Sequence, residues 1–423
     1  MSDGSCVKFN KDTHTILIPN LFPIHMDFLV DALDSQGYRA EVLKTSGREV
    51  LDAGLKYVHN DMCYPAICSV GQQLYAITSG QYDPHKVALL QFQTGGGCRA
   101  SNYAMLLQKA LEKMKMEYIP VITIGFSAAL QNGNSIKFTP KLCTKALAAL
   151  TYGDMLMLLK NQVRPYEVNE GETLEMVAHW SKIISAELKS KNAAVSCLKK
   201  NLLSMVKDFA QIQVKHTQKV KVGIVGEIYV KYSPFGNNEL ESFLDSQDCE
   251  YMLPGVLGFV HYCLSNTDVD YQLYGGNCVK RGVGLLLEKA IDIYESILKS
   301  AVEKYPKFIA PVSFQQMKEN GTKVLHRGVK MGEGWFLPAE MVELIEHGYS
   351  NIICTQPFGC LPNHIVGKGI IRRFYDIYPQ ANICPIDYDA NASAVNQENR
   401  LKLMLAVAKD KFNACPEGNP VSV

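Results

Sequence analysis

Short runs of apolar, mostly β-branched residues recur along the chain, and longer segments of mixed polarity separate them. Runs of this length without polar alternation are typical of strands buried on both faces of a parallel sheet. In the segment from Arg99 to Met116, Leu106, Ala110 and Met114 follow at four-residue intervals, as on one face of an amphipathic helix. Alternating strands and helices predict an α/β fold. The predicted strands are Thr15–Ile18, Val87–Phe92, Val121–Ile124, Val222–Val225 and Ile352–Cys354.

The order of these elements divides the chain into three parts. Residues 1–140 are predicted to form a first α/β lobe, and residues 216–423 a second lobe with a helical insertion from Val279 to Lys304. Residues 141–215 are dense in Ala, Leu and Lys and show few strand signals, which predicts a helical connection. We therefore expect two Rossmann-like (flavodoxin-like) lobes with mostly parallel sheets, joined by a helical segment.

Charge and hydropathy exclude several classes of partner. The 423 residues carry 43 Lys and Arg against 42 Asp and Glu, a formal net charge of +1, so no overall field attracts nucleic acid or an anionic membrane. The amino terminus has no signal-peptide pattern, and no apolar run approaches the roughly 20 residues of a membrane span. These features predict a cytoplasmic protein with no nucleic-acid and no membrane partner.

Thirteen cysteines are a high number for such a chain. An odd number in a reducing compartment argues against a disulfide framework, and thiolate–metal chemistry becomes the leading alternative. Most of the cysteines are expected to be small buried hydrophobic residues.

Three cysteines, Cys63, Cys98 and Cys360, differ from most others because each lies in a Gly- or Pro-containing turn just before a predicted helix. Cys98 and Cys360 also follow predicted strands, so their thiols should emerge at the carboxyl ends of strands, where open α/β sheets bind ligands. Helix N-termini lower the pKa of a thiol and offer free amides, which suits an anionic metal cluster.

The spacing of these cysteines is wide, and the sequence has no Cys-x-x-Cys pair. This argues against a zinc ribbon and a ferredoxin-type cluster, and places a shared site between the two lobes. The neighbouring glycine run, Gly95 to Gly97, equally suits a phosphate-binding loop. On residues alone, a metal protein and a metal-free, phosphate- or nucleotide-binding α/β protein both remain open.

The segments around these cysteines resemble one family. They are similar to the 2-hydroxyacyl-CoA dehydratase and benzoyl-CoA reductase type of iron–sulfur proteins, most of all to the acyl-CoA dehydratase activase-related proteins, with double-cubane cluster proteins as relatives. The resemblance covers about residues 15 to 410 and is strongest in His59–Ala66, Gly95–Tyr103, Val225–Val230 and Thr355–His364.

The resemblance implies that Cys63, Cys98 and Cys360 hold an iron–sulfur cluster, a [4Fe–4S] cluster with three Cys ligands and one open iron. A double cubane [8Fe–9S] is the alternative and needs more ligands. Cys278, in a glycine turn before a helix, is the best extra candidate, whereas Cys68 and Cys354 are expected to be packed in the core. A separate ATP-hydrolysing iron–sulfur activator would supply low-potential electrons, since this chain has no nucleotide-binding loop of the Gly-x-x-x-x-Gly-Lys type.

Other residues of these segments are candidates for the same site. Glu227 ends an apolar strand and His364 follows Cys360 by about one helical turn, so both are candidate catalytic groups. Gly97, Arg99 and Asn60 are candidate cofactor-binding residues, because each lies beside one of the cysteines.

Three functions are therefore compared. The first is a reductase or 2-hydroxyacyl-CoA dehydratase-like component of anaerobic metabolism that acts on a small molecule, with an acyl-CoA as one candidate. The second is a non-catalytic electron carrier or cluster scaffold in a homo- or hetero-oligomer. The third is the metal-free protein with a phosphate-binding glycine loop. The sequence identifies no substrate, because no CoA-specific pocket is recognisable in it.

Overall fold

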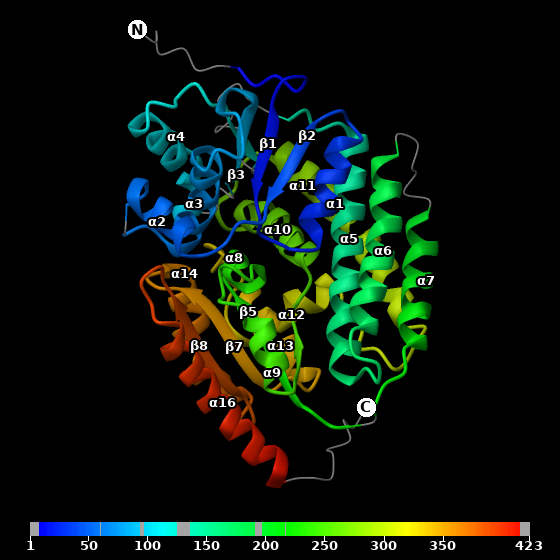
Figure 1. Ribbon diagram of the computed structural model, residues 1–423. Helices are drawn as coiled ribbons and strands as arrows, with labels where there is room; N and C mark the ends of the chain where they lie inside the picture. The colour runs from blue at the N-terminus through cyan, green and yellow to red at the C-terminus, as the bar shows by residue number, and fades with distance from the viewer. Residues whose placement is uncertain are drawn as a thin grey trace.

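The computed structural model describes residues 8–59, 61–93, 97–124, 136–190, 197–215 and 217–414. Within these residues the protein is an α/β fold with two four-stranded sheets, and every strand pair in both sheets is parallel. The predicted fold class is confirmed. Figure 1 shows the sheet of the amino-terminal half above that of the carboxyl-terminal half, with a group of long helices along one side.

The first sheet has the strand order β2-β1-β3-β4. Its strands are buried runs such as Ile16 to Ile18, which are at most 1% exposed, as expected for a sheet with helices on its faces. The strands are β1 (Thr15–Pro19), β2 (Arg39–Leu43), β3 (Val87–Phe92) and β4 (Val121–Ile124), and the helices are α1 (His25–Asp34), α2 (Arg48–Tyr57), α3 (Tyr64–Thr78) and α4 (Tyr103–Lys113).

The second sheet repeats this order as β6-β5-β7-β8, so the first strand of each sheet lies between the second and the third. Its strands are β5 (Val220–Gly226), β6 (Cys249–Met252), β7 (Asn351–Pro357) and β8 (Asn382–Tyr388). Its helices are α8 (Ile228–Tyr232), α9 (Leu240–Ser246), α10 (Val256–Tyr274), α11 (Cys278–Val302), α12 (Phe314–Val324), α13 (Phe336–Glu346), α14 (Leu361–Asn363), α15 (Ile371–Ile377) and α16 (Ala394–Ala414).

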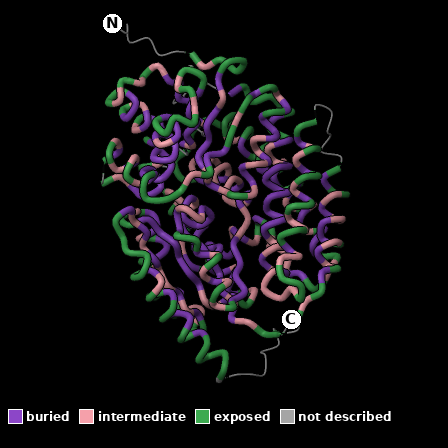
Figure 2. Tube along the Cα trace, viewed as in Figure 1, coloured by how far each residue is buried: buried purple, intermediate pink, exposed green. Residues whose placement is uncertain are grey.

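Three long helices connect the sheets: α5 (Pro140–Val163), α6 (Glu172–Lys189) and α7 (Leu198–Gln211). Among the described residues, one segment, Pro140–Tyr166, is long and apolar enough to cross a membrane, although the sequence pattern had indicated none. Because 72% of its apolar window is buried and α5 packs against α1, α6, α7, α10 and α11, it is a core helix of the fold. Figure 2 shows the strands and the inner sides of these helices as buried.

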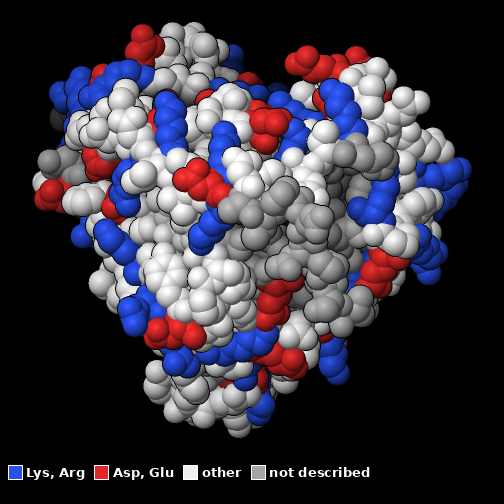
Figure 3. Space-filling view, turned by 90° about the horizontal axis from the view of Figure 1, so that it is seen from below, with Lys and Arg blue, Asp and Glu red and all other residues white. Residues whose placement is uncertain are grey.

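One hydrophobic core runs through both halves. It contains Leu89 of the first sheet, Leu156 of α5 and Ile224 of the second sheet, and a smaller core covers the other face of the second sheet. This shared core holds the two sheets in a defined relative position. On the face shown in Figure 3, acidic and basic side chains are interspersed, in line with the near-zero net charge.

Candidate functional site

The structure places each of the three candidate cysteines at the first residue before a helix. Cys63 precedes α3, Cys98 precedes a short 3₁₀ helix (Arg99–Asn102), and Cys360 precedes α14. Cys98 follows β3 and Cys360 follows β7, which are the third strands of the two sheets. The predicted positions at the carboxyl ends of strands are confirmed for these two residues.

The three thiols have one acidic neighbour in common, Glu227. Burial is the main factor that raises the pKa of Cys63, Cys98 and Cys360, and the charge of Glu227 raises the pKa of each of them further. The charge of Glu333 also raises the pKa of Cys98 and Cys360. Residues from both halves of the chain are thus close enough to share two acidic neighbours.

The first two cysteine turns are joined directly. The Tyr103 hydroxyl of α4 lies 2.8 Å from Cys63 Sγ, and the two side chains belong to one small buried cluster. Arg99, next to Cys98, donates a hydrogen bond to the backbone carbonyl of Asp61, close to Cys63. The Arg99 side chain is exposed, and its hydrogen bond to Asp61 connects the Cys98 turn to the Cys63 turn.

Glu227 occupies the turn between β5 and α8. Its Oε2 accepts hydrogen bonds from the amides of Tyr229 (3.0 Å) and Val230 (2.9 Å), which caps α8. The preceding Gly226 has φ +139°, and a Cβ there would lie 1.9 Å from the carbonyl oxygen of Thr355 in β7. Glycine is therefore required for the chain to turn Glu227 towards the cysteines.

Glu333 is a site residue that the sequence analysis missed. Its Oε1 accepts a hydrogen bond from the Ile228 amide (3.2 Å) and its Oε2 one from Asn363 Nδ2 (2.7 Å), so it joins α8 to the Cys360 turn. The same Nδ2 lies 3.4 Å from Cys360 Sγ. The available signal was the Gly332-Glu333-Gly334 run, whose glycines have φ values of +60° and +48°.

Glu227 and Glu333 are acidic neighbours. Burial raises the pKa of each carboxyl, and the charge of Glu333 raises that of Glu227 further. Lys231 opposes this shift in both and pairs at 2.7 Å with Glu340, both side chains being 2% exposed. Such a pair holds a proton more readily than an isolated carboxylate does, because two adjacent charges repel.

Helix N-termini were expected to lower the pKa values of the three thiols, but burial raises these pKa values by more. Backbone hydrogen bonds from Ala66, Ala100 and Asn363 act in the predicted direction on Cys63, Cys98 and Cys360 respectively. Burial exceeds them, however, and raises the pKa of Cys63 to about 11. Two of the helices have only three or four residues, which leaves little helix dipole to favour a thiolate.

The rim of the site is apolar. Gly97 lies against Met331, since a Cβ on Gly97 would be 2.4 Å from the Met331 sulfur. Met331 is 55% exposed, and Phe358, Leu361 and Ile365 near Cys360 are 66%, 71% and 52% exposed. Exposed apolar side chains at this density are typical of a surface that another molecule covers.

The remaining predicted site residues have different surroundings. His364 donates from Nδ1 to the carbonyl oxygen of Cys360 (2.9 Å), and its Nε2 lies 3.7 Å from Asp387, so it is held beside the turn. Cys278 is exposed at the first residue of α11, and none of the interactions described connects it to the other three cysteines. Asn60, like Gly95 and Gly96 of the glycine run, lies outside the described residues.

Cys68 and Cys354, which were expected to be packed, are both 0% exposed and lie in the hydrophobic cores. The core prediction for these two thiols is therefore confirmed. Cys263, partly buried on α10, also has Glu333 as an acidic neighbour, but it follows no strand and precedes no helix.

As they stand, the three thiols are spaced too widely to bind one four-coordinate ion together. Four-coordinate zinc holds its thiolates at about 3.8 Å from one another, whereas the three sulfurs do not all come within 4.8 Å of one another. In a cluster each cysteine binds a different iron, so the sulfurs stand farther apart. Asn363 Oδ1, buried beside Cys360, also makes no hydrogen bond within the described part of the chain.

Comparison with protein-family models and with curated proteins finds no match for this chain.

Proposed function

We propose that Cys63, Cys98 and Cys360 hold an iron–sulfur cluster, a [4Fe–4S] cluster in its simplest form, and that the protein is a cytoplasmic low-potential redox protein. The observation that carries the proposal is that three helix-preceding thiols from both halves of the chain, with the Tyr103 hydroxyl on Cys63 and Asn363 beside Cys360, share Glu227 as an acidic neighbour. The family resemblance of the same segments supports it.

The bound cluster would supply single electrons and, with three thiolate ligands, one iron open to another ligand. The chain's own residues place carboxyl and hydroxyl groups that hold protons beside the cysteines. Burial raises the pKa of the Glu227 and Glu333 carboxyls, which favours their protonated forms. Tyr103 hydrogen-bonds Cys63, and Asn363 lies between Cys360 and Glu333.

A buried carboxyl pair beside the cysteines, with the pKa of both groups raised, favours a catalytic component over a simple carrier. A carrier needs only burial and tuning of its cluster, whereas reduction or dehydration of a small molecule also requires proton transfer. We therefore propose a reductase or 2-hydroxyacyl-CoA dehydratase-like reaction, with an acyl-CoA as a candidate substrate.

The electron donor in this proposal is a separate ATP-hydrolysing iron–sulfur protein. The exposed apolar residues Met331, Phe358, Leu361 and Ile365 border the cysteine turns and offer a docking surface close to the cluster. Short electron-transfer distances require such a surface near the cluster ligands. The double cubane is the less favoured form, because Cys278 is exposed.

Anaerobic purification with iron and sulfide analysis tests the cluster directly. We expect brown protein with close to stoichiometric iron and sulfide, and a large loss of both in Cys63→Ser, Cys98→Ser and Cys360→Ser, because each substitution removes a ligand. Cys143→Ser and Cys197→Ser are matched controls, since both cysteines are exposed on the connecting helices.

Full iron content in all three ligand variants, or colourless wild-type protein, would contradict the assignment. EPR spectroscopy of the reduced protein distinguishes the two redox functions. A signal that shifts on adding cyanide or a thioester indicates an open iron, whereas an unresponsive signal indicates a carrier.

A further inference from the structure

A second group of metal-ligating side chains lies away from the cysteines, between α10 and α11. His261 of α10 faces Asp292 and Glu295 of α11, and one ligand atom of each residue lies within 4.8 Å of the other two. His261 Nδ1 is 3.2 Å from Glu295, and its Nε2 is 3.9 Å from Asp292. Facing helices of this kind are a common scaffold for metal sites.

The imidazole is held in a fixed orientation. His261 is 1% exposed, and its ring stacks on Phe314 with the ring centres 3.6 Å apart and the planes 13° from parallel. The acidic partners are also arranged regularly, because residues 288, 292 and 295 follow one another at intervals of four and three along α11 and so share one face. A rigid histidine opposite a row of carboxylates needs little reorganisation to bind an ion.

Negative charge around the imidazole exceeds the positive charge that the structure supplies. Glu288, the third carboxylate of the row, lies 3.8 Å from His261 Nε2 and is paired with Lys318 at 3.3 Å through the same oxygen. Its other oxygen, Oε1, makes no hydrogen bond within the described residues, although the side chain is only 8% exposed. A buried carboxylate oxygen without a donor is costly unless a cation is close.

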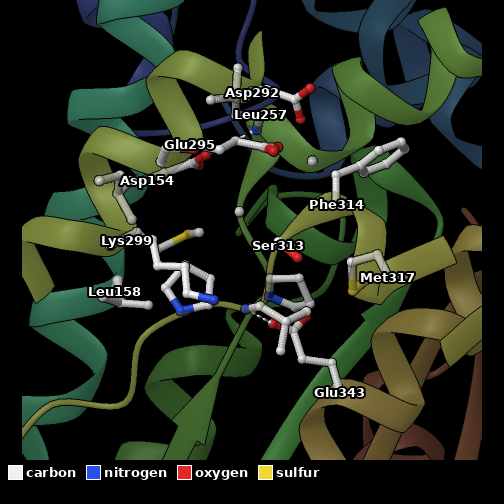
Figure 4. A pocket seen from close by; sticks show the side chains of 18 of the residues that line it. Asp154, Leu158, Leu257, Asp292, Glu295, Lys299, Ser313, Phe314, Met317 and Glu343 are labelled. Carbon is white, nitrogen blue, oxygen red and sulfur yellow. Dashed lines mark hydrogen bonds between the residues drawn. The ribbon is translucent and has the colours of Figure 1, made fainter. Parts of the chain in front are cut away.

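The group borders a cavity of about 110 Å³. Asp292 and Glu295 lie at one end of it and Glu343 at the other (Figure 4). Asp154 adds another acidic side chain to the lining and Lys299 a basic one. An ion at the Asp292–Glu295 end would therefore have coordination positions open to the cavity for water or a small anion.

We propose that His261, Asp292 and Glu295 bind a divalent transition-metal cation, at a site separate from the cysteines. Imidazole with two carboxylates suits Zn²⁺, Mn²⁺ or Fe²⁺. The carboxylates must move closer to the ring on binding, because zinc–ligand distances of roughly 2.0–2.2 Å bring ligand atoms nearer than 4.8 Å. Asp292 has room for this movement, since its side chain is 56% exposed.

Mn²⁺ is the probe of choice, because it prefers nitrogen and oxygen ligands and leaves the thiols free. The full-length protein, purified anaerobically, is titrated with Mn²⁺ while the room-temperature EPR signal of the free ion is recorded. We expect one Mn²⁺ per chain and its release by excess Zn²⁺. Asp292→Asn should weaken binding by about tenfold or more, because loss of even an outer-shell partner of a metal ligand costs roughly 10–100-fold in affinity.

Glu303→Gln is the matched control, because Glu303 immediately follows α11 and contacts Lys299 rather than His261. It should bind Mn²⁺ as the wild type does. Glu295→Gln is a second test variant in case Asp292→Asn lowers thermal stability. No bound Mn²⁺ at millimolar concentration, or equal affinity in the control and both test variants, would overturn the proposal and leave His261 as a structural ion-pair residue.

Discussion

The two carboxyls of the candidate site, Glu227 and Glu333, differ in how easily they can be recognised from the sequence. Glu227 is recognisable because a charged residue directly follows the apolar run of β5. Glu333 follows a glycine in a turn and has no periodic pattern around it. Its burial, 7% exposed, comes from contacts with Ile228 and Asn363, which are 105 and 30 residues away in the sequence. Such burial is a property of the folded loops and not of the local sequence.

Glu343 of α13 should make stability depend on pH. Burial raises its pKa from 4.5 to about 7, with smaller contributions of the same sign from Glu340 and Glu295. Because the folded pKa exceeds the unfolded one, the contribution is fully present below pH 4.5 and is lost as the pH rises to 7. The loss is at most about 3 kcal/mol, since one pKa unit corresponds to roughly 1.4 kcal/mol.

Glu343→Gln removes this titration and keeps an oxygen to accept the hydrogen bond from the Val312 amide, 2.9 Å in the wild type. We expect urea unfolding in metal-free buffer to show a stability gain over the wild type that is small at pH 5 and larger at pH 8. Glu346→Gln, on the exposed side of the same helix, should follow the wild-type profile. Parallel profiles for wild type and Glu343→Gln would contradict the prediction.

At the scale of single elements, the strands found from sequence are the four central strands, β1, β3, β5 and β7, and one edge strand, β4. The runs at β1, β3, β4, β5 and β7 match the structure, and the three strands that were missed, β2, β6 and β8, all lie at sheet edges. These three are less regular in sequence than the edge strand β4 (Val121–Ile124): β2 is partly exposed, β6 includes Glu250, and β8 includes Pro385. Proline is tolerated in an edge strand because the backbone on its outer side makes no hydrogen bonds to a neighbouring strand.

The turn from β5 to α8 depends on Gly226. Gly226→Ala would place a Cβ against the Thr355 carbonyl at a φ of +139°, so we expect loss of stability of several kcal/mol or no folded protein. Urea unfolding measures this loss.

Gly282→Ala should have the opposite effect, because Gly282 lies inside α11 and nothing lies within 4 Å of a Cβ there. We expect the free energy of unfolding to rise by roughly 0.5–1 kcal/mol.

At the scale of the whole molecule, the two halves share the strand order 2-1-3-4 and use equivalent positions. Cys98 follows β3, the third strand of the first sheet, and Cys360 follows β7, the third strand of the second. The helix before each of these strands is α3 or α13, and it is preceded by Cys63 in the first half and by Glu333 in the second. The carboxyl ends of both sheets thus contribute to one site. Neither half alone supplies all three thiols.

Asp154 of α5 links the halves. Its carboxylate accepts hydrogen bonds from the Val256 and Leu257 amides at the start of α10, at 2.7 and 2.9 Å, and lies 2.8 Å from His25 Nε2 of α1. Asp154→Ala should lower the free energy of unfolding by about 2–4 kcal/mol, because it leaves buried partners without an acceptor. Glu175→Ala, an exposed carboxylate on α6, should change it by less than about 0.5 kcal/mol.

Chemical denaturation followed by circular dichroism measures both variants. A change in Asp154→Ala no larger than that in Glu175→Ala would show that the buried carboxylate does not hold α1 and α10 to α5.

The sequence by itself determined the α/β class, the central strands and the three cysteines before helices, because these depend on local periodicity and turn residues. Tertiary structure decided that residues as distant as Cys63 and Cys360 share Glu227 as a neighbour, that Glu333 lies beside Cys360, and that Cys278 is exposed. Tertiary structure also decided the direction in which the pKa values of the three thiols shift. Burial is set by the packing of both halves and outweighs the local effect of a helix N-terminus on each thiol.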